Sequence, residues 1–232
     1  MLRKYNYFLL LGGLLFMLLG GSFGTENPHL STRVVVDVTL FAVFILGVWA
    51  LVKSRAAFVA GWVLGGITFV LTLSAQATDT LLLQYLALTA VLIFFLLTCV
   101  ITVYDVLFGG AIDINRLVGA ACIYLLSGSL WGIIYFLLSV IAPTSFAGVQ
   151  AEGWSEQLNE LTYHSFVTLT TLGYGDVTPV EPVARTLCYL EAVLGQMYLT
   201  VLVAALVGLH IATRRSVFAA REAADSALAA DA

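Results

Sequence analysis

The stretch at residues 168–176 reads Thr168-Leu169-Thr170-Thr171-Leu172-Gly173-Tyr174-Gly175-Asp176. It lies between two long apolar segments, and its two glycines stand at alternate positions with a tyrosine between them. Glycine tolerates the positive φ values that other residues avoid, so this spacing permits a backbone that presents successive carbonyl groups to one side. Carbonyl groups arranged in this way can replace the hydration shell of a cation without adding a fixed charge.

The composition of the chain predicts an integral membrane protein. Of its 232 residues, 61% are hydrophobic and 10% are charged, and the mean hydropathy is +1.01. Soluble domains are about half apolar and about a quarter charged. The apolar runs are continuous rather than alternating, which favours membrane helices over a β-barrel. The net charge of −4 gives no indication of a nucleic-acid partner.

A membrane-spanning helix needs about 20 mostly apolar residues. Six segments meet this length, at residues 5–23, 34–52, 56–74, 81–104, 117–141 and 183–212. The apolar segment 158–170 is too short to cross, so we expect a re-entrant helix there. The first segment has an alternative interpretation as a cleaved signal peptide, although its apolar run is longer than is usual for one.

The basic residues predict the orientation of these segments. Only Arg33 and Arg185 fall on one side of the six-span arrangement. The other side carries Arg3, Lys4, Lys53, Arg55, Arg116, Arg214, Arg215 and Arg221. Because basic residues are concentrated in cytoplasmic loops, we expect both termini to be cytoplasmic and the 168–176 stretch to face outside. The predicted location is the plasma membrane.

The sequence Thr-Thr-Leu-Gly-Tyr-Gly-Asp at 170–176 resembles the selectivity filter of the tetrameric potassium channel family, which reads Thr-x-Gly-Tyr-Gly followed by Asp. The resemblance implies that the carbonyl groups of Thr171, Leu172, Gly173 and Tyr174 coordinate K⁺. It also implies that the Thr171 hydroxyl is the innermost ligand. Leu172 stands where valine is usual, and both residues contribute only a carbonyl. K⁺ is then the permeant ion, and no cofactor is expected.

The same resemblance assigns supporting roles to residues beside the filter. Thr170 offers a hydroxyl at the end of the short helix, and Gly175 continues the alternation of glycines. Asp176 would lie at the outer mouth, where four copies form a ring of carboxylates that attracts cations. An aromatic residue of the preceding helix bonds this aspartate in the family, and the matching position here is Tyr163.

One filter strand cannot surround an ion, and the chain contains a single copy of the motif. The resemblance therefore implies a homotetramer with the pore on its four-fold axis. The expected partners are three further copies of the chain, the lipid bilayer and K⁺. The short segment after Arg214 is too small for a regulatory ligand domain.

The last span contains the candidates for a hinge and a gate. Pro182 is suited to the first position of this helix. Gly195 falls where members of the family carry a glycine that lets the inner helix bend, and Gly208 is a second candidate. A glycine within a span can equally serve close packing, so both interpretations remain open. Leu202 and Leu206 are candidates for a hydrophobic gate at the cytoplasmic mouth.

Glu191 lies within the last span, and an ionisable group inside a membrane is a functional candidate by default. Three roles remain open for it. Its carboxyl group could pair with a hydroxyl of the short helix, act as a pH sensor, or support the filter from behind.

Six spans with the filter between the last two resemble the layout of voltage-gated channels, but the first four spans lack the voltage sensor of that family. Such a sensor needs several arginines along the fourth span, and segment 81–104 contains no Arg or Lys. We therefore expect a four-helix domain at 1–104 that does not sense voltage. A cytoplasmic linker at 105–115, a pore domain at 116–213 and a short cytoplasmic tail at 214–232 would follow.

The sequence thus predicts an all-α membrane protein with six transmembrane helices, a re-entrant pore helix and a filter loop, assembled as a tetramer. Its predicted function is that of a potassium-selective channel without a classical voltage sensor. No pattern typical of an enzyme is present. Two alternatives stay open: a weakly selective channel for monovalent cations, and a subunit of a potassium transporter.

Overall fold

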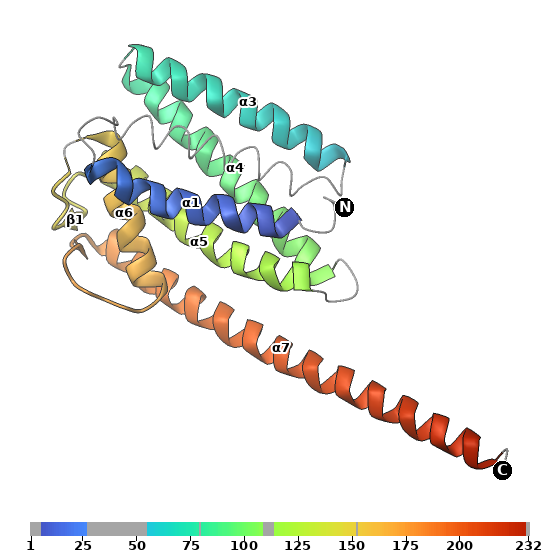
Figure 1. Ribbon diagram of the computed structural model, residues 1–232. Coiled ribbons are helices and arrows are strands. Elements are labelled where there is room, and N and C mark those ends of the chain that lie inside the picture. The colour runs from blue at the N-terminus through green and yellow to red at the C-terminus, as the bar shows by residue number, and fades with distance from the viewer. Residues whose placement is uncertain (1–5, 27–54, 79, 109–113, 152, 231–232) are drawn as a thin grey trace.

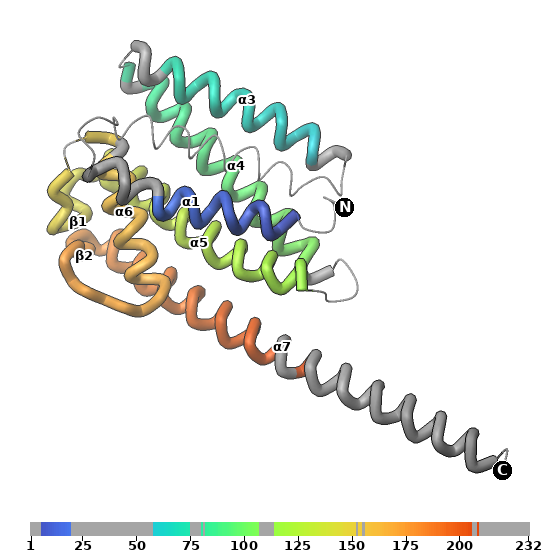
Figure 2. The backbone as a smooth tube through the Cα atoms, viewed as in Figure 1, coloured from blue at the N-terminus to red at the C-terminus, as the bar shows by residue number. Residues whose placement is uncertain are grey.

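A computed structural model describes the backbone of residues 6–26, 55–78, 80–108, 114–151 and 153–230 (Figure 1). Figure 2 colours the narrower set of residues whose side chains are also described. The predicted span at 34–52 lies outside the described residues. The protein is mostly helical, as the composition predicted. Its elements are α1 (Asn6–Glu26), α3 (Arg55–Thr78), α4 (Leu81–Phe108), α5 (Ile114–Ile141), β1 (Phe146–Ala147), α6 (Trp154–Leu169), β2 (Thr178–Pro179) and α7 (Pro182–Ala230).

Three described segments are long and apolar enough to cross a membrane: Leu82–Val106, Ile114–Ile141 and Pro182–Ala205. Asn6–Leu19 and Phe58–Ser74 are shorter apolar helices. The protein is therefore a membrane protein. The arrangement with six membrane-spanning helices remains a prediction.

Two helix boundaries follow from proline. Helix α5 ends at Ile141, two residues before Pro143, because proline cannot continue a helix. Helix α7 begins at Pro182, whose fixed φ and missing N–H are tolerated at a first helical position. Both boundaries were predicted from the sequence.

The short helix α6 begins earlier than the apolar run suggested. It starts at Trp154, four residues before the predicted start at residue 158. The Trp154 ring packs edge-on against Phe136 of α5, with 5.0 Å between ring centroids, and against Tyr85 of α4 at 6.2 Å. These aromatic contacts extend α6 into a polar stretch that hydropathy alone assigns to a loop.

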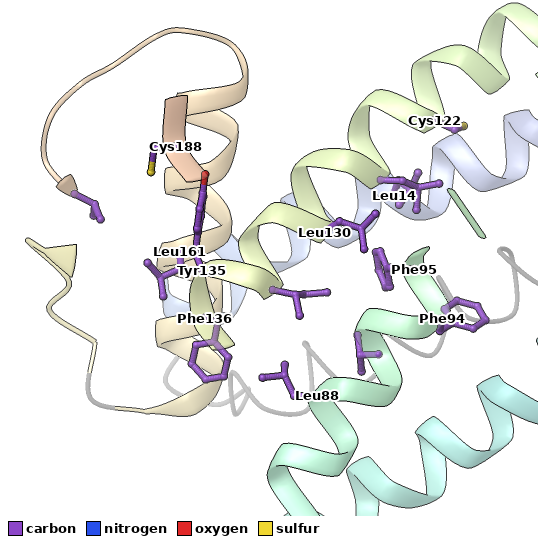
Figure 3. Packing of buried hydrophobic residues seen from close by; sticks show 14 of the residues in the cluster. Leu14, Leu88, Phe94, Phe95, Cys122, Leu130, Tyr135, Phe136, Leu161 and Cys188 are labelled. Atoms are coloured by element: carbon purple, nitrogen blue, oxygen red, sulfur yellow. The ribbon is translucent and has the colours of Figure 1, made fainter. Parts of the chain in front are cut away.

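Figure 1 shows α1, α4 and α5 running side by side, with α3 against α4 on the outer side. Helix α6 lies against α5 at one end of this bundle. Helix α7 contacts α6 and α5 with its first part and then extends past the bundle. In the core, Phe95 of α4 lies beside Leu14 of α1 and Leu130 of α5 (Figure 3). The core thus joins α5 to the helices that precede it.

At the opposite end of the bundle from α6, the ends of three helices meet at Tyr7. The Tyr7 hydroxyl donates a 2.5 Å hydrogen bond to Asp105 near the end of α4. The Tyr7 N–H donates to the side chain of Asn115 at the start of α5, at 3.3 Å. The start of α1, the end of α4 and the start of α5 therefore share one side.

Two glycines of α5 allow α6 to approach closely. A Cβ atom added at Gly132 would lie 2.7 Å from the Cα atom of Thr162, and one added at Gly128 would lie 2.6 Å from the Phe166 ring. Both distances are shorter than a van der Waals contact. The Gly-x-x-x-Gly spacing in α5 therefore makes a contact surface for α6, as small residues do between helices in lipid.

We predict that Gly132→Ala destabilises the protein by about 1–3 kcal/mol, the usual cost of overpacking a tight contact. The backbone of Thr162 cannot move aside as a flexible side chain can. The measurement is thermal unfolding of the purified protein in detergent. Gly66→Ala in α3 is the control, because no atom lies within 4 Å of its added Cβ. Equal melting temperatures for the two variants would contradict the packing role of Gly132.

Candidate functional site

The loop at residues 171–176, called the 171–176 loop below, is held by the end of helix α6. The N–H groups of Leu172 and Gly173 both donate to the carbonyl of Val167, at 2.9 and 3.3 Å. The N–H of Thr171 donates to the carbonyl of Thr168 at 2.9 Å. The last carbonyl groups of a helix lack partners within it, and here the loop supplies them. The N–H groups of the first three residues of the loop are thus turned back toward α6.

The backbone of the 171–176 loop is left-handed at every second residue. The φ values are +59° at Thr171, +62° at Gly173 and +78° at Gly175. Alternating left- and right-handed residues align successive peptide groups, whereas a β-strand points them in alternate directions. Among the described residues, no donor reaches the carbonyl oxygens of residues 171–174. The carbonyl groups of these residues are therefore candidate ligands for a cation.

The glycines of this loop are required for conformation rather than for space. An added Cβ at Gly173 or Gly175 would meet no atom within 4 Å in the single chain. A side chain at positive φ is nevertheless strained, at a cost of about 1–3 kcal/mol. Thr171 adopts this conformation in spite of its branched Cβ. Thr170, which precedes it as the C-cap residue of α6, is exposed and donates its hydroxyl to the Phe166 carbonyl at 2.7 Å.

The hydroxyl of Thr171 has a partner on helix α7 that was not predicted from the sequence. The Gln196 side chain donates to Thr171 Oγ1 at 3.3 Å, and Thr171 Oγ1 itself donates to the Thr170 carbonyl at 2.7 Å. The signal in the sequence was an amide residue within an apolar segment, next to Gly195. Helix α7 thus contributes a polar group at the start of the loop.

Asp176, at the other end of the loop, is bonded to helix α6. The Tyr163 hydroxyl donates to Asp176 Oδ2 at 2.7 Å, and the Val177 N–H donates to Oδ1 at 3.0 Å. The bond between Tyr163 and Asp176 is the one that the resemblance implied. It holds the pKa of Asp176 below its ordinary value, because the hydrogen bond favours the ionised form.

A two-stranded antiparallel ribbon supports this end of the loop. Strand β1 pairs with β2, with Phe146 opposite Pro179 and Ala147 opposite Thr178. Gly148, at φ +91°, lies against the Asp176 carbonyl, where a Cβ atom would not fit. The ribbon therefore fixes the chain that leaves the loop toward α7.

Behind the loop, aromatic side chains bury the middle of α6. The His164 ring lies 5.5 Å from both Tyr135 of α5 and Phe146 of β1, measured between centroids. Its Nε2 atom lies 3.5 Å from the thiol of Cys188 in α7. Figure 3 shows Tyr135 and Cys188 in this part of the core. His164 is thus a packed residue of α6.

Gly195 lies where α7 meets the end of α6. An added Cβ would lie 2.6 Å from the Leu169 carbonyl oxygen and 2.8 Å from its side chain. The Leu169 carbonyl also accepts a 3.2 Å hydrogen bond from Tyr124 of α5. Close packing, one of the two interpretations of Gly195, is therefore present; a role as a hinge remains a prediction.

The other gate candidates lie farther along α7. Gly208 is exposed, and its added Cβ would meet no atom within 4 Å. Leu202 is partly buried. The side chain of Leu206 lies outside the described residues. Their roles as a hinge or gate remain predictions.

Glu191 is fully buried, at 0% exposure, and contacts both helices beside α7. Tyr135 of α5 lies 2.5 Å from one carboxyl oxygen, and Ser165 of α6 lies 2.5 Å from the other. Pairing with a hydroxyl of α6, one of the roles left open, is therefore observed. Tyr135 and Ser165 could not be predicted as its partners from the sequence, because they come from two different helices.

Residues 116–210 match the protein-family model described as ion channel. The matched range begins in α5, includes α6 and the 171–176 loop, and ends in α7. No curated protein matches the chain. The match supports an ion channel in a membrane rather than an enzyme. Within the matched range, the free carbonyl groups of the loop and the residues that hold them form the candidate ion site.

We predict that Tyr163→Phe raises the pKa of Asp176 toward its ordinary value. In the native protein the lowered pKa of Asp176 stabilises the fold at pH values above the pKa that this residue has in the unfolded chain. This stabilisation is lost as the pH falls through the pKa of Asp176 in the folded protein. Without the Tyr163 hydroxyl this contribution should shrink. The measurement is an NMR titration of ¹³C-labelled aspartate carboxyl groups, assigned with Asp176→Asn.

Tyr189→Phe is the matched control, because Tyr189 is an exposed tyrosine of α7. It should leave the Asp176 titration unchanged. An unchanged titration in Tyr163→Phe would mean that the hydrogen bond does not govern the ionisation of Asp176.

Proposed function

We propose that the protein is one subunit of a potassium-selective channel that conducts K⁺ passively through a ring of backbone carbonyl groups. The observation that carries this proposal is the left-handed backbone at Thr171, Gly173 and Gly175, with the carbonyl groups of 171–174 free of described donors. In potassium channels such groups replace the hydration shell of the ion. Thr171, Leu172, Gly173 and Tyr174 would supply the ligands, with the Thr171 hydroxyl innermost.

The proposed assembly is a homotetramer. A single strand supplies ligands from one side only, and four copies around an axis would complete the shell. The exposure of the apolar side chains supports this assembly: Leu172 is 55% and Tyr174 is 67% exposed in the single chain. Large apolar side chains are also exposed along α7, among them Val183, Tyr189, Leu190, Val193, Leu194, Met197, Val201 and Val203. Neighbouring subunits and lipid would cover these surfaces.

Asp176 is proposed to act at the outer mouth of the pore. Its carboxyl group is exposed, and its lowered pKa keeps it ionised at neutral pH. Four such carboxylates would raise the local concentration of cations. Gly175 and Tyr163 would hold this residue in place, and Glu191 would support α6 from behind.

We further propose that the channel lies in the plasma membrane, with both termini cytoplasmic and the loop outside. The eight basic residues on one side of the predicted spans support this orientation. The absence of Arg and Lys from α4 supports conduction that is not controlled by a classical voltage sensor. Gly195 and Gly208 are proposed as hinge positions, and Leu202 and Leu206 as gate positions.

The test of selectivity is ion flux into liposomes that contain the purified protein. We expect K⁺ flux that barium blocks and little Na⁺ flux. Equal K⁺ and Na⁺ flux would favour the weakly selective channel. Thermal stability in K⁺ and in Na⁺ is measured in parallel, because binding of K⁺ to the filter stabilises the tetramer even when a gate is closed. Absence of both the K⁺ flux and the stabilisation by K⁺ would overturn the proposal.

We predict that Gly173→Ala abolishes K⁺ flux and the K⁺-dependent stabilisation. Alanine at φ +62° is strained, and relief of this strain would turn a carbonyl group away from the ion path. Gly66→Ala is the control, since it adds the same methyl group in open space within α3. Normal K⁺ flux in Gly173→Ala would argue against carbonyl coordination by this loop.

A further inference from the structure

The carboxyl group of Glu191 joins three helices behind the 171–176 loop. It belongs to α7, and its two oxygen atoms lie 2.5 Å from Tyr135 of α5 and 2.5 Å from Ser165 of α6. The residue has no solvent exposure. Ser165 lies six residues before Thr171 on the helix that leads into the loop. The position of this carboxyl group therefore bears on the position of the loop.

The hydroxyl of Ser165 has two oxygen neighbours. Its Oγ atom is 2.5 Å from Glu191 Oε1 and 2.7 Å from the carbonyl oxygen of Gly128 in α5. A serine hydroxyl carries one proton, and a backbone carbonyl carries none. If Glu191 were ionised, only one of these two contacts would contain a proton. The other would bring two oxygen lone pairs together at hydrogen-bond distance.

A protonated Glu191 satisfies every contact. The acid proton on Oε1 is donated to Ser165, and the Ser165 proton is donated to the Gly128 carbonyl. The Tyr135 hydroxyl then donates to Oε2, which is the carbonyl oxygen of the acid. Each of the three short contacts thus contains one proton, and no lone pairs face each other.

The groups around Glu191 decide whether a positive charge could balance an ionised carboxylate there. The titratable groups near Glu191 are Tyr135 and Tyr124 of α5, His164 of α6 and Cys188 of its own helix. Among the described residues, no Lys or Arg side chain contacts it. An unpaired buried charge is strongly unfavourable in an apolar core, which also favours the neutral acid.

We propose that Glu191 is a neutral carboxylic acid that positions α6, and through it the 171–176 loop, by donating one hydrogen bond and accepting another. Its effect on conduction rests on the proposed channel function, whereas its protonation state does not. A glutamine offers the same donor and acceptor in the same shape. A leucine has a similar volume and offers neither.

The first experiment reads the protonation state directly. Infrared difference spectra of wild type against Glu191→Gln at neutral pH should contain the C=O stretch of a carboxylic acid that the variant lacks. Ser165→Ala should shift this band, because it removes the acceptor of the acid proton. Ser129→Ala is the control, since this buried hydroxyl of α5 bonds its own helix at Leu125 and should leave the band unchanged. A difference spectrum with carboxylate bands alone would overturn the proposal.

The second experiment tests the positioning role by measuring K⁺ flux and K⁺-dependent thermal stability. Glu191→Gln should match wild type in both. Glu191→Leu should lower the flux about tenfold or more, the factor that corresponds to the loss of a buried hydrogen bond. Wild-type flux in Glu191→Leu, or an equal loss in Glu191→Gln and Glu191→Leu, would overturn the positioning role. If wild type itself has no K⁺ effect, the proposed function fails, while the infrared band still decides the state of Glu191.

Discussion

The hydrogen bonds from the N–H groups of Leu172 and Gly173 to the Val167 carbonyl are the constraint on which the site depends. They use the donors of the loop to complete the end of α6. The carbonyl groups of the same loop then have no described partner within the chain. An unpaired carbonyl is costly in an apolar environment, so a loop of this kind persists only where water or an ion supplies the missing contact. The same bonds that end the helix therefore leave these carbonyl groups available as the candidate ion site.

The rest of the matched range holds α6 against α5 and α7. Gly128 and Gly132 let α5 approach one side of α6, and Gly195 lets α7 approach its C-terminal end. Tyr163 bonds the far end of the loop through Asp176. Glu191 joins all three helices between these points. Small residues set the distances, and a few polar contacts set the register, which apolar packing alone does not specify.

The helices that precede the matched range have a different relation to the site. Helices α1, α3 and α4 lie before residue 116, outside the range that matches ion channels. Among the described residues, helix α4 reaches the site indirectly, through its packing on α5 and through Tyr85 against Trp154 at the start of α6. The other end of α4 meets α1 and α5 at Tyr7, at the far end of the bundle. A shift of α4 would therefore act on α5 and α6 through packing rather than through the loop itself.

The sequence by itself determined that this is a membrane protein, that α5 ends before Pro143 and that α7 begins at Pro182. It also determined the loop with its alternating glycines. These are local properties: hydropathy, the fixed φ of proline and the freedom of glycine act within a few residues. The bond between Tyr163 and Asp176 could be anticipated only from the resemblance to a family. Tertiary structure alone decided that Glu191 meets Tyr135 and Ser165, that Gln196 reaches Thr171, and that α6 begins at Trp154. Each depends on which faces of separate helices meet, and apolar periodicity shows that a face is buried without naming the helix that covers it.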